Sequence, residues 1–316
     1  MDNENFDRTV VLNSEEAMAQ YEASLKSGKV KKYQDIGPGA VLGNWRILKQ
    51  LAEGGMGEIF ICHPVDDVQS RAVMKILRAN TQRSPVGKKR FLREYQLQKE
   101  MDHPCIAKML DGNFDREPEY IVIEYIEGIS LAQAVAENYE FPLEYCLYLL
   151  EVVGLTLQYA WDNFHVLHRD IKPSNIMLKE SGELVLLDFG IAKSLDDAES
   201  MLTQRGQVLG SPGFMSPEQI KQVLSCDCRT DIFSLGASIY YLLTGKTPFT
   251  GDNIAAVYDN MIHGKVTPLA ELNPAIPSEF SDLIEQMLEI APEKRPQNWD
   301  EFLEMVAVVK ESILPA

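Results

Sequence analysis

The chain has 316 residues, of which 45% are hydrophobic and 24% are charged, which is the usual composition of a globular protein with a substantial core. Asp and Glu number 47 against 30 Lys and Arg, and the formal net charge at pH 7 is -17. This negative charge argues against a surface that binds nucleic acid or anionic membranes, so any phosphate must be recognised locally.

The sequence predicts a cytoplasmic protein without a membrane span. The N-terminal residues MDNENFDRTV lack the basic stretch and apolar run of a secretory signal. The most apolar stretch, 147–161, is too short to cross a bilayer and contains Glu151. The five cysteines are an odd number, and Cys226 and Cys228 lack the spacing of a zinc site, so we expect reduced thiols.

Residues 1–40 differ in composition from the rest of the chain and are interpreted as an appendage. They are polar and acidic up to the Gly-Pro-Gly turn at 37–39. Residues 13–16 have the spacing of a capping box, and apolar residues follow at helical intervals, which favours one short amphipathic helix. A mostly disordered tail fits the same residues equally well, because an isolated short helix is marginal in water.

Residues 41–126 are expected to form a strand-rich lobe. Four stretches with the β-branched and aromatic content of strands occur there, namely WRILKQL, EIFICH, RAVMKIL and YIVIEY. One amphipathic helix is predicted between them, at 87–101.

Residues 127–312 are expected to form a helix-rich lobe. A short strand pair is predicted at 176–179 and 184–187, joined by a turn. A strand-rich lobe followed by a helix-rich lobe is an α+β, two-lobed architecture. Long helices are predicted at 143–164, 229–243, 254–263, 278–288 and 299–312.

A glycine-rich segment, AEGGMG at 52–57, lies between two predicted strands. Glycines in such a hairpin allow bare backbone N–H groups to approach phosphate oxygens. Taken alone, the segment is better explained as an ordinary turn. It is neither a Walker loop nor a dinucleotide-binding loop, because both of those lead into a helix.

Lys75 is a charged residue in the otherwise apolar stretch AVMKIL. An ammonium group that faces inward needs a partner, because burial of an unpaired charge is costly. Glu94, on the following predicted helix, is the candidate partner. The alternative is that Lys75 lies on an edge strand and reaches solvent.

The sequence HRDIKPSN at 168–175, followed by DFG at 188–190, carries the most specific chemistry. Asp170 can orient a hydroxyl group and accept its proton. Asn175 and Asp188 offer the hard oxygen ligands that Mg²⁺ prefers, and Lys172 can balance the charge of a transferred phosphoryl group. The set is suited to phosphoryl transfer, which requires positioning and charge neutralisation.

These motifs resemble those of eukaryotic-like protein kinases, and GGMGEIF and HRDIKPSNIM are most similar to bacterial Ser/Thr kinases. The resemblance runs from about 45 to 308. It implies a two-lobed kinase fold, ATP and Mg²⁺ as cofactors, Asp170 as the catalytic base assisted by Lys172, and Asn175 and Asp188 as metal ligands. The ATP-binding residues that it implies are Ala52, Gly54, Gly55, Gly57, Ile59, Val73, Lys75, Glu94, Glu124, Ile126 and Met177.

Within that set, the resemblance assigns several specific contacts. Residues 54–57 would cover the phosphates of ATP, and Lys75 would hold the α- and β-phosphates and pair with Glu94. The Glu124 carbonyl and the Ile126 N–H would form the adenine hinge. Ile123 would be the gatekeeper, while Ile59, Val73 and Met177 would enclose the adenine ring.

The resemblance also covers structural landmarks of the second lobe. Residues 210–218 are similar to the end of an activation segment, and 231–236 to the start of its anchoring helix. Arg295 would pair with Glu218 as a buried structural ion pair. Three residues depart from the family pattern, and they bear on affinity and rate because none is a catalytic group: Ala52, Val73 and Ser216.

The leading interpretation is an active kinase that phosphorylates Ser or Thr of protein substrates, with self-association allowing autophosphorylation in trans. The alternative is a pseudokinase-like scaffold that binds nucleotide without catalysis. Pseudokinases typically lack one of three residues that are present here, Lys75, Asp170 and Asp188. A small-molecule kinase is disfavoured because Lys172 and residues 210–218 match the parts that hold a protein substrate.

Regulation through the loop between residues 190 and 216 is also expected from the resemblance. Arg169 and Lys193 would bind a phosphate on this loop, with Thr203 as the best acceptor and Ser200 and Ser194 behind it. The acidic residues of 196–199 offer an alternative, because they could pair with the same cations without any modification.

Thr203→Ala is predicted to lower activity toward an external substrate more than Ser194→Ala does, because only the first removes the phosphate that would order the loop. Kinetic assays of both variants, with phosphosite mapping by mass spectrometry, test this. An unmodified loop in active protein, together with a silent Thr203→Ala, would mean that the acidic residues or another mechanism order the loop.

Overall fold

In the computed structural model, the described residues are 36–54, 57–77, 85–115, 118–189, 212–221, 226–264 and 266–314. The side chains of residues 53, 54, 57, 77, 85–91 and 94 are outside the description. The expected helix near residue 13, and the loop with Lys193, Ser194, Ser200 and Thr203, therefore lie outside the described residues.

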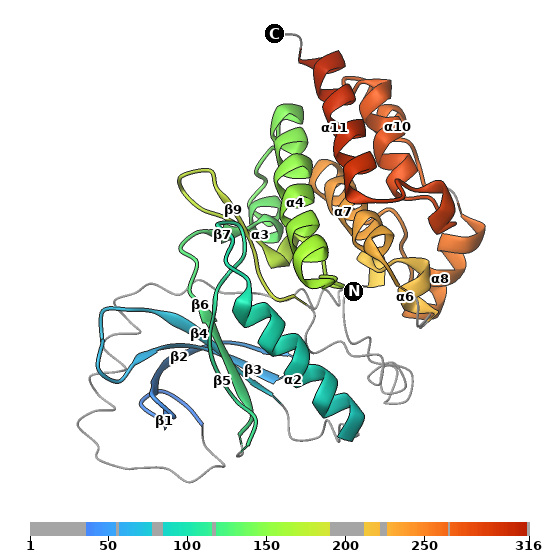
Figure 1. Ribbon diagram of the computed structural model, residues 1–316. Coiled ribbons are helices and arrows are strands. Elements are labelled where there is room, and N and C mark those ends of the chain that lie inside the picture. The colour runs from blue at the N-terminus through green and yellow to red at the C-terminus, as the bar shows by residue number, and fades with distance from the viewer. Residues whose placement is uncertain are drawn as a thin grey trace. The chain divides into compact units, whose positions relative to one another are not determined.

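The chain divides into two compact units (Figure 1). The first unit comprises Met1–Arg83 and Ala107–Tyr125. The second comprises Ser84–Ile106 and Ile126–Ala316. Each unit has a hydrophobic core of its own.

The first unit contains a six-stranded antiparallel sheet in the order β1-β2-β3-β4-β6-β5. The four segments predicted from their β-branched and aromatic content all form strands of this sheet. The strands are β1 (Val41–Leu42), β2 (Trp45–Gly54), β3 (Gly57–Pro64), β4 (Ala72–Leu77), β5 (Met109–Asn113) and β6 (Tyr120–Glu124).

Alternation along β3, β4 and β6 separates two faces of this sheet. One face forms the core of the unit, with Phe60, Met74 and Val122 at most 1% exposed. Ile36 and Trp45 are among the residues that pack against this core. The opposite face is therefore the one on which a strand can present functional side chains.

Strand β5 was not predicted from the sequence. Its residues, MLDGN, include Asp, Gly and Asn, which strands usually avoid. Pairing with β6 forms the strand nevertheless, with a register shift between Met109 and Asp111. The Trp45 indole N–H donates to Asp111 Oδ2 at 2.8 Å, so a contact distant in sequence stabilises a segment with weak strand propensity.

The second unit is mainly helical, as predicted, and the five long predicted helices all form. Its three-stranded sheet has the order β7-β8-β9, with β7 (Ile129–Ser130), β8 (Ile176–Leu178) and β9 (Leu184–Leu186). The helices are α2 (Pro85–Glu100), α3 (Leu131–Ala136), α4 (Leu143–Phe164), α6 (Pro217–Ile220), α7 (Cys228–Thr244), α8 (Ile254–His263), α9 (Leu269–Leu272), α10 (Ser278–Met287) and α11 (Trp299–Ile313).

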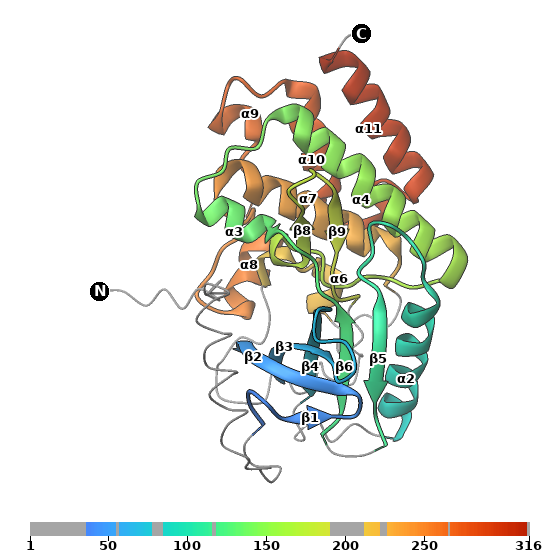
Figure 2. The ribbon, with the colours of Figure 1, turned by 90° about the vertical axis from the view of Figure 1, so that its left-hand side faces the viewer.

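Helix α7 lies at the centre of this unit, between α4 and α10 (Figure 1 and Figure 2). It is buried on nearly all sides, and Phe233, Leu235 and Ile239 are 0% exposed. Asp227 begins the helix by accepting a bond from Arg229 N at 3.1 Å. A buried helix of this kind offers a rigid support for loops that bond to its first turn.

A buried ion pair joins helix α6 to the segment that precedes α11. Arg295 is 1% exposed, and its Nη1 and Nη2 donate to the Glu218 carboxylate at 2.7 and 3.0 Å. The remaining N–H groups of the guanidinium donate to the backbone carbonyls of Arg229, Glu289 and Ile290. The pair expected from the sequence is therefore confirmed, with each guanidinium donor satisfied.

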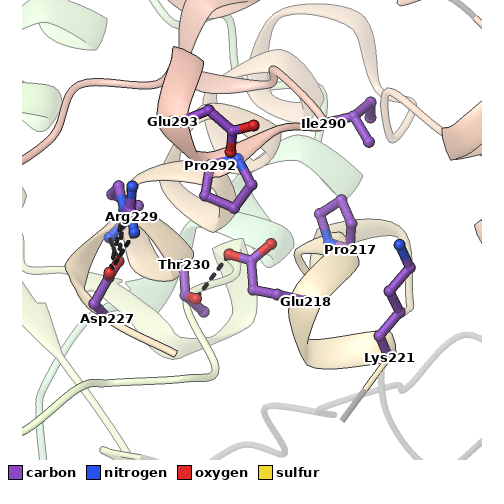
Figure 3. A pocket seen from close by; sticks show the side chains of 9 residues that line it. All are labelled: Pro217, Glu218, Lys221, Asp227, Arg229, Thr230, Ile290, Pro292 and Glu293. Carbon is purple, nitrogen blue, oxygen red and sulfur yellow. Dashed lines mark hydrogen bonds and ion pairs between the residues drawn. The ribbon is translucent and has the colours of Figure 1, made fainter. Parts of the chain in front are cut away.

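The carboxylate of Glu218 is also bonded on its other side. Thr230 Oγ1 donates to Glu218 Oε1 at 2.8 Å, as Figure 3 shows. Burial raises the pKa of Glu218, but the charge of Arg295 and the hydrogen bonds that the carboxylate accepts, including that from Thr230, together hold the pKa below its usual value. Beside the pair lies an open cavity of about 310 Å³, where Asp227 and Arg229 are bonded to each other at 2.7 Å (Figure 3).

Two other sequence expectations concern cysteines and the membrane. None of the five cysteines forms a disulfide in the structure. Among the described residues, no helix combines the length and the apolar character needed to cross a membrane.

Arg295→Met is predicted to lower the free energy of unfolding by about 3–5 kcal/mol, because it leaves the Glu218 carboxylate buried without its partner. Lys294→Met is the matched control. Lys294 pairs with Glu289 at the surface, at 3.8 Å, and its loss should cost less than about 1 kcal/mol. Denaturant unfolding of both variants is the measurement, and equal losses would show that the buried pair is not structural.

Candidate active site

The HRDIKPSN loop lies in the second unit, between α4 and β8, and ends in a 3₁₀ turn at Pro173–Asn175. The first turn of α7 holds the beginning of the loop. Asp231 Oδ2 accepts a hydrogen bond from His168 N, and Asp231 Oδ1 accepts one from Arg169 N, both at 2.8 Å. Each oxygen of one buried carboxylate thus binds one peptide group of the loop.

The buried position of Asp231 has an electrostatic cost. Its side chain is 1% exposed, and burial raises the pKa of its carboxyl from 3.8 to about 6, although the two backbone N–H donors oppose this shift. An ionised carboxylate in this place is tolerated because both of its oxygens accept bonds. Asp231 therefore has a structural role toward the loop.

His168 connects the loop to the segment before Asp188. Its ring is 0% exposed, with Nε2 at 2.8 Å from the Leu187 carbonyl oxygen and Nδ1 at 3.3 Å from Asp170 N. Because a carbonyl only accepts and a peptide N–H only donates, these partners require the proton on Nε2. The ring also packs against Phe189, with centroids 4.7 Å apart.

The carboxylate of Asp170 is oriented by two neighbours. Asn175 Nδ2 donates to the Asp170 carbonyl oxygen at 2.8 Å and to Asp170 Oδ2 at 2.9 Å. Lys172 Nζ lies 3.5 Å from the same Oδ2. The Asp170 and Lys172 side chains are 17% and 19% exposed, so the structure brings together a partly accessible base candidate and a cation.

Two residues of this site have a left-handed backbone, which is uncommon outside glycine. Arg169 has φ 60° and Asp188 has φ 53°. Such conformations cost of order 1–3 kcal/mol and persist where surrounding contacts determine them. The bonds from Asp231 to residue 169 and from His168 to Leu187 are contacts of this kind.

Asn175 and Asp188 fit the expected role of magnesium ligands. Both bonds of Asn175 to Asp170 use the amide nitrogen, which turns the amide oxygen Oδ1 to the other side. Leu187 N donates to the Asn175 carbonyl at 2.9 Å and brings the segment before Asp188 beside the loop. Among the described residues, no cluster of three or more His, Cys, Asp or Glu could hold a metal. Mg²⁺ typically needs only one or two protein ligands when phosphates supply the rest.

Three of the residues expected to bind ATP, namely Ile59, Val73 and Lys75, share a face of the sheet of the first unit. Ile59 lies opposite Lys75 in the register of β3 and β4, and Val73 lies opposite Ile123 in that of β4 and β6. Strand β4 lies between β3 and β6, so the edge-strand interpretation of Lys75 is wrong. Lys75 is partly buried, on the face opposite Met74.

For the other expected ATP-binding residues, the structure describes backbone pairing or exposure, and some lie outside the described residues. Ala52 pairs with Ile59, and Glu124 ends β6, its N–H bonded to the Lys108 carbonyl at 2.9 Å. In the second unit, Ile126 is 7% exposed, and Met177 lies half-buried on β8. Gly55, and the side chain of Glu94 on α2, lie outside the described residues, while Gly54 and Gly57 are placed as paired strand ends.

Sequence reasoning missed two residues that contact the loop. Asp231 was assigned only to the start of a helix, although an isolated Asp in the apolar run TDIFSLGASIYYLL signals a buried carboxylate with partners. Gln219 was not considered, and its Nε2 donates to the Arg169 carbonyl at 2.9 Å. The spacing of Ser216 and Gln219 predicts a capping box, but it does not predict the bond from Gln219 to the Arg169 carbonyl.

The raised pKa of Asp231 predicts a pH-dependent contribution to stability. A carboxyl with a higher pKa in the folded state contributes stability below its unfolded pKa and loses it as pH rises through about 6. Between pH 7 and pH 5, wild type should therefore gain about 1 kcal/mol in free energy of unfolding relative to Asp231→Asn. Unfolding of both proteins at the two pH values measures this, and an unchanged difference would contradict the assignment.

Comparisons with known proteins agree with this geometry. Residues 45–306 match the protein kinase domain family. The chain is 32% identical over 269 residues to a probable serine/threonine-protein kinase of Clostridium perfringens, covering 84% of this chain and 38% of the relative. It is 31% identical to PrkC of Bacillus subtilis, covering 77% and 37%, and 31% identical to PknB of Mycobacterium tuberculosis, covering 78% and 40%.

Solved structures show the same fold. The kinase domain of Mycobacterium tuberculosis PknI is similar with a TM-score of 0.67 at 21% identity, covering 87% of this chain and 100% of that one. The apo form of PpkA-294 is similar with a TM-score of 0.68 at 24% identity, covering 86% and 99%. The chain spans about two fifths of the length of the curated relatives named above. This chain belongs to the protein kinase domain family, and the relatives named above are bacterial Ser/Thr protein kinases.

Proposed function

We propose that this chain transfers the γ-phosphoryl group of ATP to serine or threonine hydroxyls of protein substrates. The observation that carries the proposal is the Asp170 carboxylate, which Asn175 and Lys172 orient within a loop bonded to Asp231. This is a partly accessible base beside a cation, in a chain of the protein kinase family. That arrangement suits the positioning and neutralisation of charge on which phosphoryl transfer depends.

In this proposal, Asp170 accepts the proton of the substrate hydroxyl while its Oδ2 remains bonded to Asn175. Lys172 stabilises negative charge on the transferred group, and its place two residues after Asp170 favours Ser and Thr acceptors. Mg²⁺, when bound, neutralises the phosphates of ATP. Asn175 Oδ1 and the Asp188 carboxylate would hold it.

The nucleotide contacts belong to the same proposal. Lys75 would bind the α- and β-phosphates and pair with Glu94, and residues 54–57 would cover the phosphates. Ile59, Val73 and Met177 would contact adenine, whose edge would bond to the backbone of 124–126. The central place of β4 in its sheet supports the role of Lys75, since a lysine there is not at a solvent-facing edge.

A nucleotide-binding scaffold without catalysis is the alternative function. No observation on the described residues favours it, because Lys75, Asp170 and Asp188 are all present and Asp170 is oriented by its neighbours. Residues 1–40 as an appendage, lobes at 41–126 and 127–312, self-association for autophosphorylation in trans and a cytoplasmic location complete the proposal.

Asp170→Asn is predicted to lower kcat by about 10²–10⁴ with little change in melting temperature, because it removes the base while the amide keeps the shape of the side chain. The assay is phosphate transfer to a Ser/Thr-containing protein at saturating ATP and Mg²⁺. Asp282→Asn, an exposed aspartate on α10, is the matched control and should transfer at the wild-type rate. Wild-type rates from Asp170→Asn would remove Asp170 as the base.

A further inference from the structure

We propose that Gln219 is a positioning residue for phosphoryl transfer: its side-chain amide fixes the peptide group between Arg169 and Asp170, and thereby the direction of the Asp170 carboxylate. The inference rests on the proposed function, since it concerns the same base. It adds a residue from helix α6, 49 positions beyond Asp170 in the chain.

The Gln219 amide makes two bonds in different directions. Nε2 donates to the Arg169 carbonyl oxygen at 2.9 Å, and Oε1 accepts from Ser216 N at 3.0 Å. The second bond belongs to the capping box of α6, in which Ser216 Oγ also accepts from Gln219 N at 3.4 Å. A side-chain amide can donate and accept at once, so glutamine suits both partners.

The peptide group that Gln219 contacts leads directly into Asp170. Its carbonyl accepts from Gln219, and its N–H, that of Asp170, lies 3.3 Å from His168 Nδ1. The preceding peptide N–H, that of Arg169, donates to Asp231. Two consecutive peptide planes around a residue with φ 60° are therefore held by three side chains from different parts of the chain.

Helix α6 has anchors other than Gln219. Glu218, the residue before it, bonds to Arg295 at 2.7 Å and to Thr230 at 2.8 Å. A change at Gln219 therefore leaves these anchors of α6 in place and removes the contact with the loop. This separation makes the positioning role testable apart from folding.

Loss of the hydrogen bond from Gln219 to the Arg169 carbonyl lets the 169–170 peptide group rotate. This rotation changes the orientation of the Asp170 carboxylate. Misplacement of a reacting group by about 1 Å can cost about 100-fold in rate. Because the remaining contacts from Asn175 and Lys172 are kept, we expect a smaller fall in kcat, of about 10-fold. The KM for ATP should change less than about twofold, since Gln219 would contact no part of the nucleotide.

The experiment compares Gln219→Leu and Gln219→Glu with wild type. Leucine removes both side-chain bonds, whereas glutamate keeps an acceptor for Ser216 N and loses the donor to Arg169. Gln158→Leu is the matched control, because Gln158 Nε2 donates to Asp300 at 2.6 Å, away from the loop. The readouts are kcat, the KM for ATP, melting temperature and hydrogen exchange of the amides of 168–170.

The inference is supported if both Gln219 variants lose about 10-fold in kcat with an unchanged KM for ATP and faster exchange at 168–170, while Gln158→Leu matches wild type. Wild-type kcat in Gln219→Glu would show that only the capping bond matters, and would overturn the inference. Wild-type behaviour in both variants would also overturn it.

The same measurements separate this inference from the proposed function. A wild type no more active than Asp170→Asn would contradict the kinase activity itself. In that case, hydrogen exchange alone tests whether Gln219 positions the loop, since the exchange measurement does not require catalytic activity. Unchanged protection at 168–170 in Gln219→Leu would reject it, and faster exchange would uphold it.

Discussion

The arrangement of the catalytic loop depends on the carboxylate of Asp231. This group lies in the first turn of the buried helix α7 and accepts N–H groups from His168 and Arg169 at 2.8 Å. Because α7 is packed on almost every side, these bonds attach the loop to a helix that the hydrophobic core holds in place. These two bonds offset only part of the cost of burying the carboxylate, because its pKa is still raised to about 6.

The other contacts of the site extend from this one. The His168 ring, part of the loop, is hydrogen-bonded to the carbonyl of Leu187, the residue before Asp188. Asn175, at the end of the loop, donates a hydrogen bond to the Asp170 carboxylate. Gln219 contacts the same loop from helix α6, which the Glu218–Arg295 pair fixes. Hydrogen bonds of this kind from residues distant in sequence keep Arg169 in its left-handed conformation.

Much of the fold and the set of candidate site residues could be predicted from the sequence, because that information is local. The apolar patterns of α4 and α8 predict their bounds, and HRDIKPSN and DFG are contiguous motifs. The hydrogen bonds that join Asp231 and Gln219 to the HRDIKPSN loop could not be predicted, since their partners lie 50–63 positions away in the chain. Strand β5 was missed for a related reason, because pairing with β6 overrides its weak propensity.

The central claim is that Asp170, held in this way, directs phosphate to Ser and Thr hydroxyls. Phosphosite mapping by mass spectrometry tests it most directly, on purified protein incubated with Mg²⁺ and ATP beside the Asp170→Asn variant. The account predicts phosphoserine or phosphothreonine in wild type and almost none in the variant. Equal phosphorylation of the two proteins, or phosphate confined to tyrosine, would contradict it.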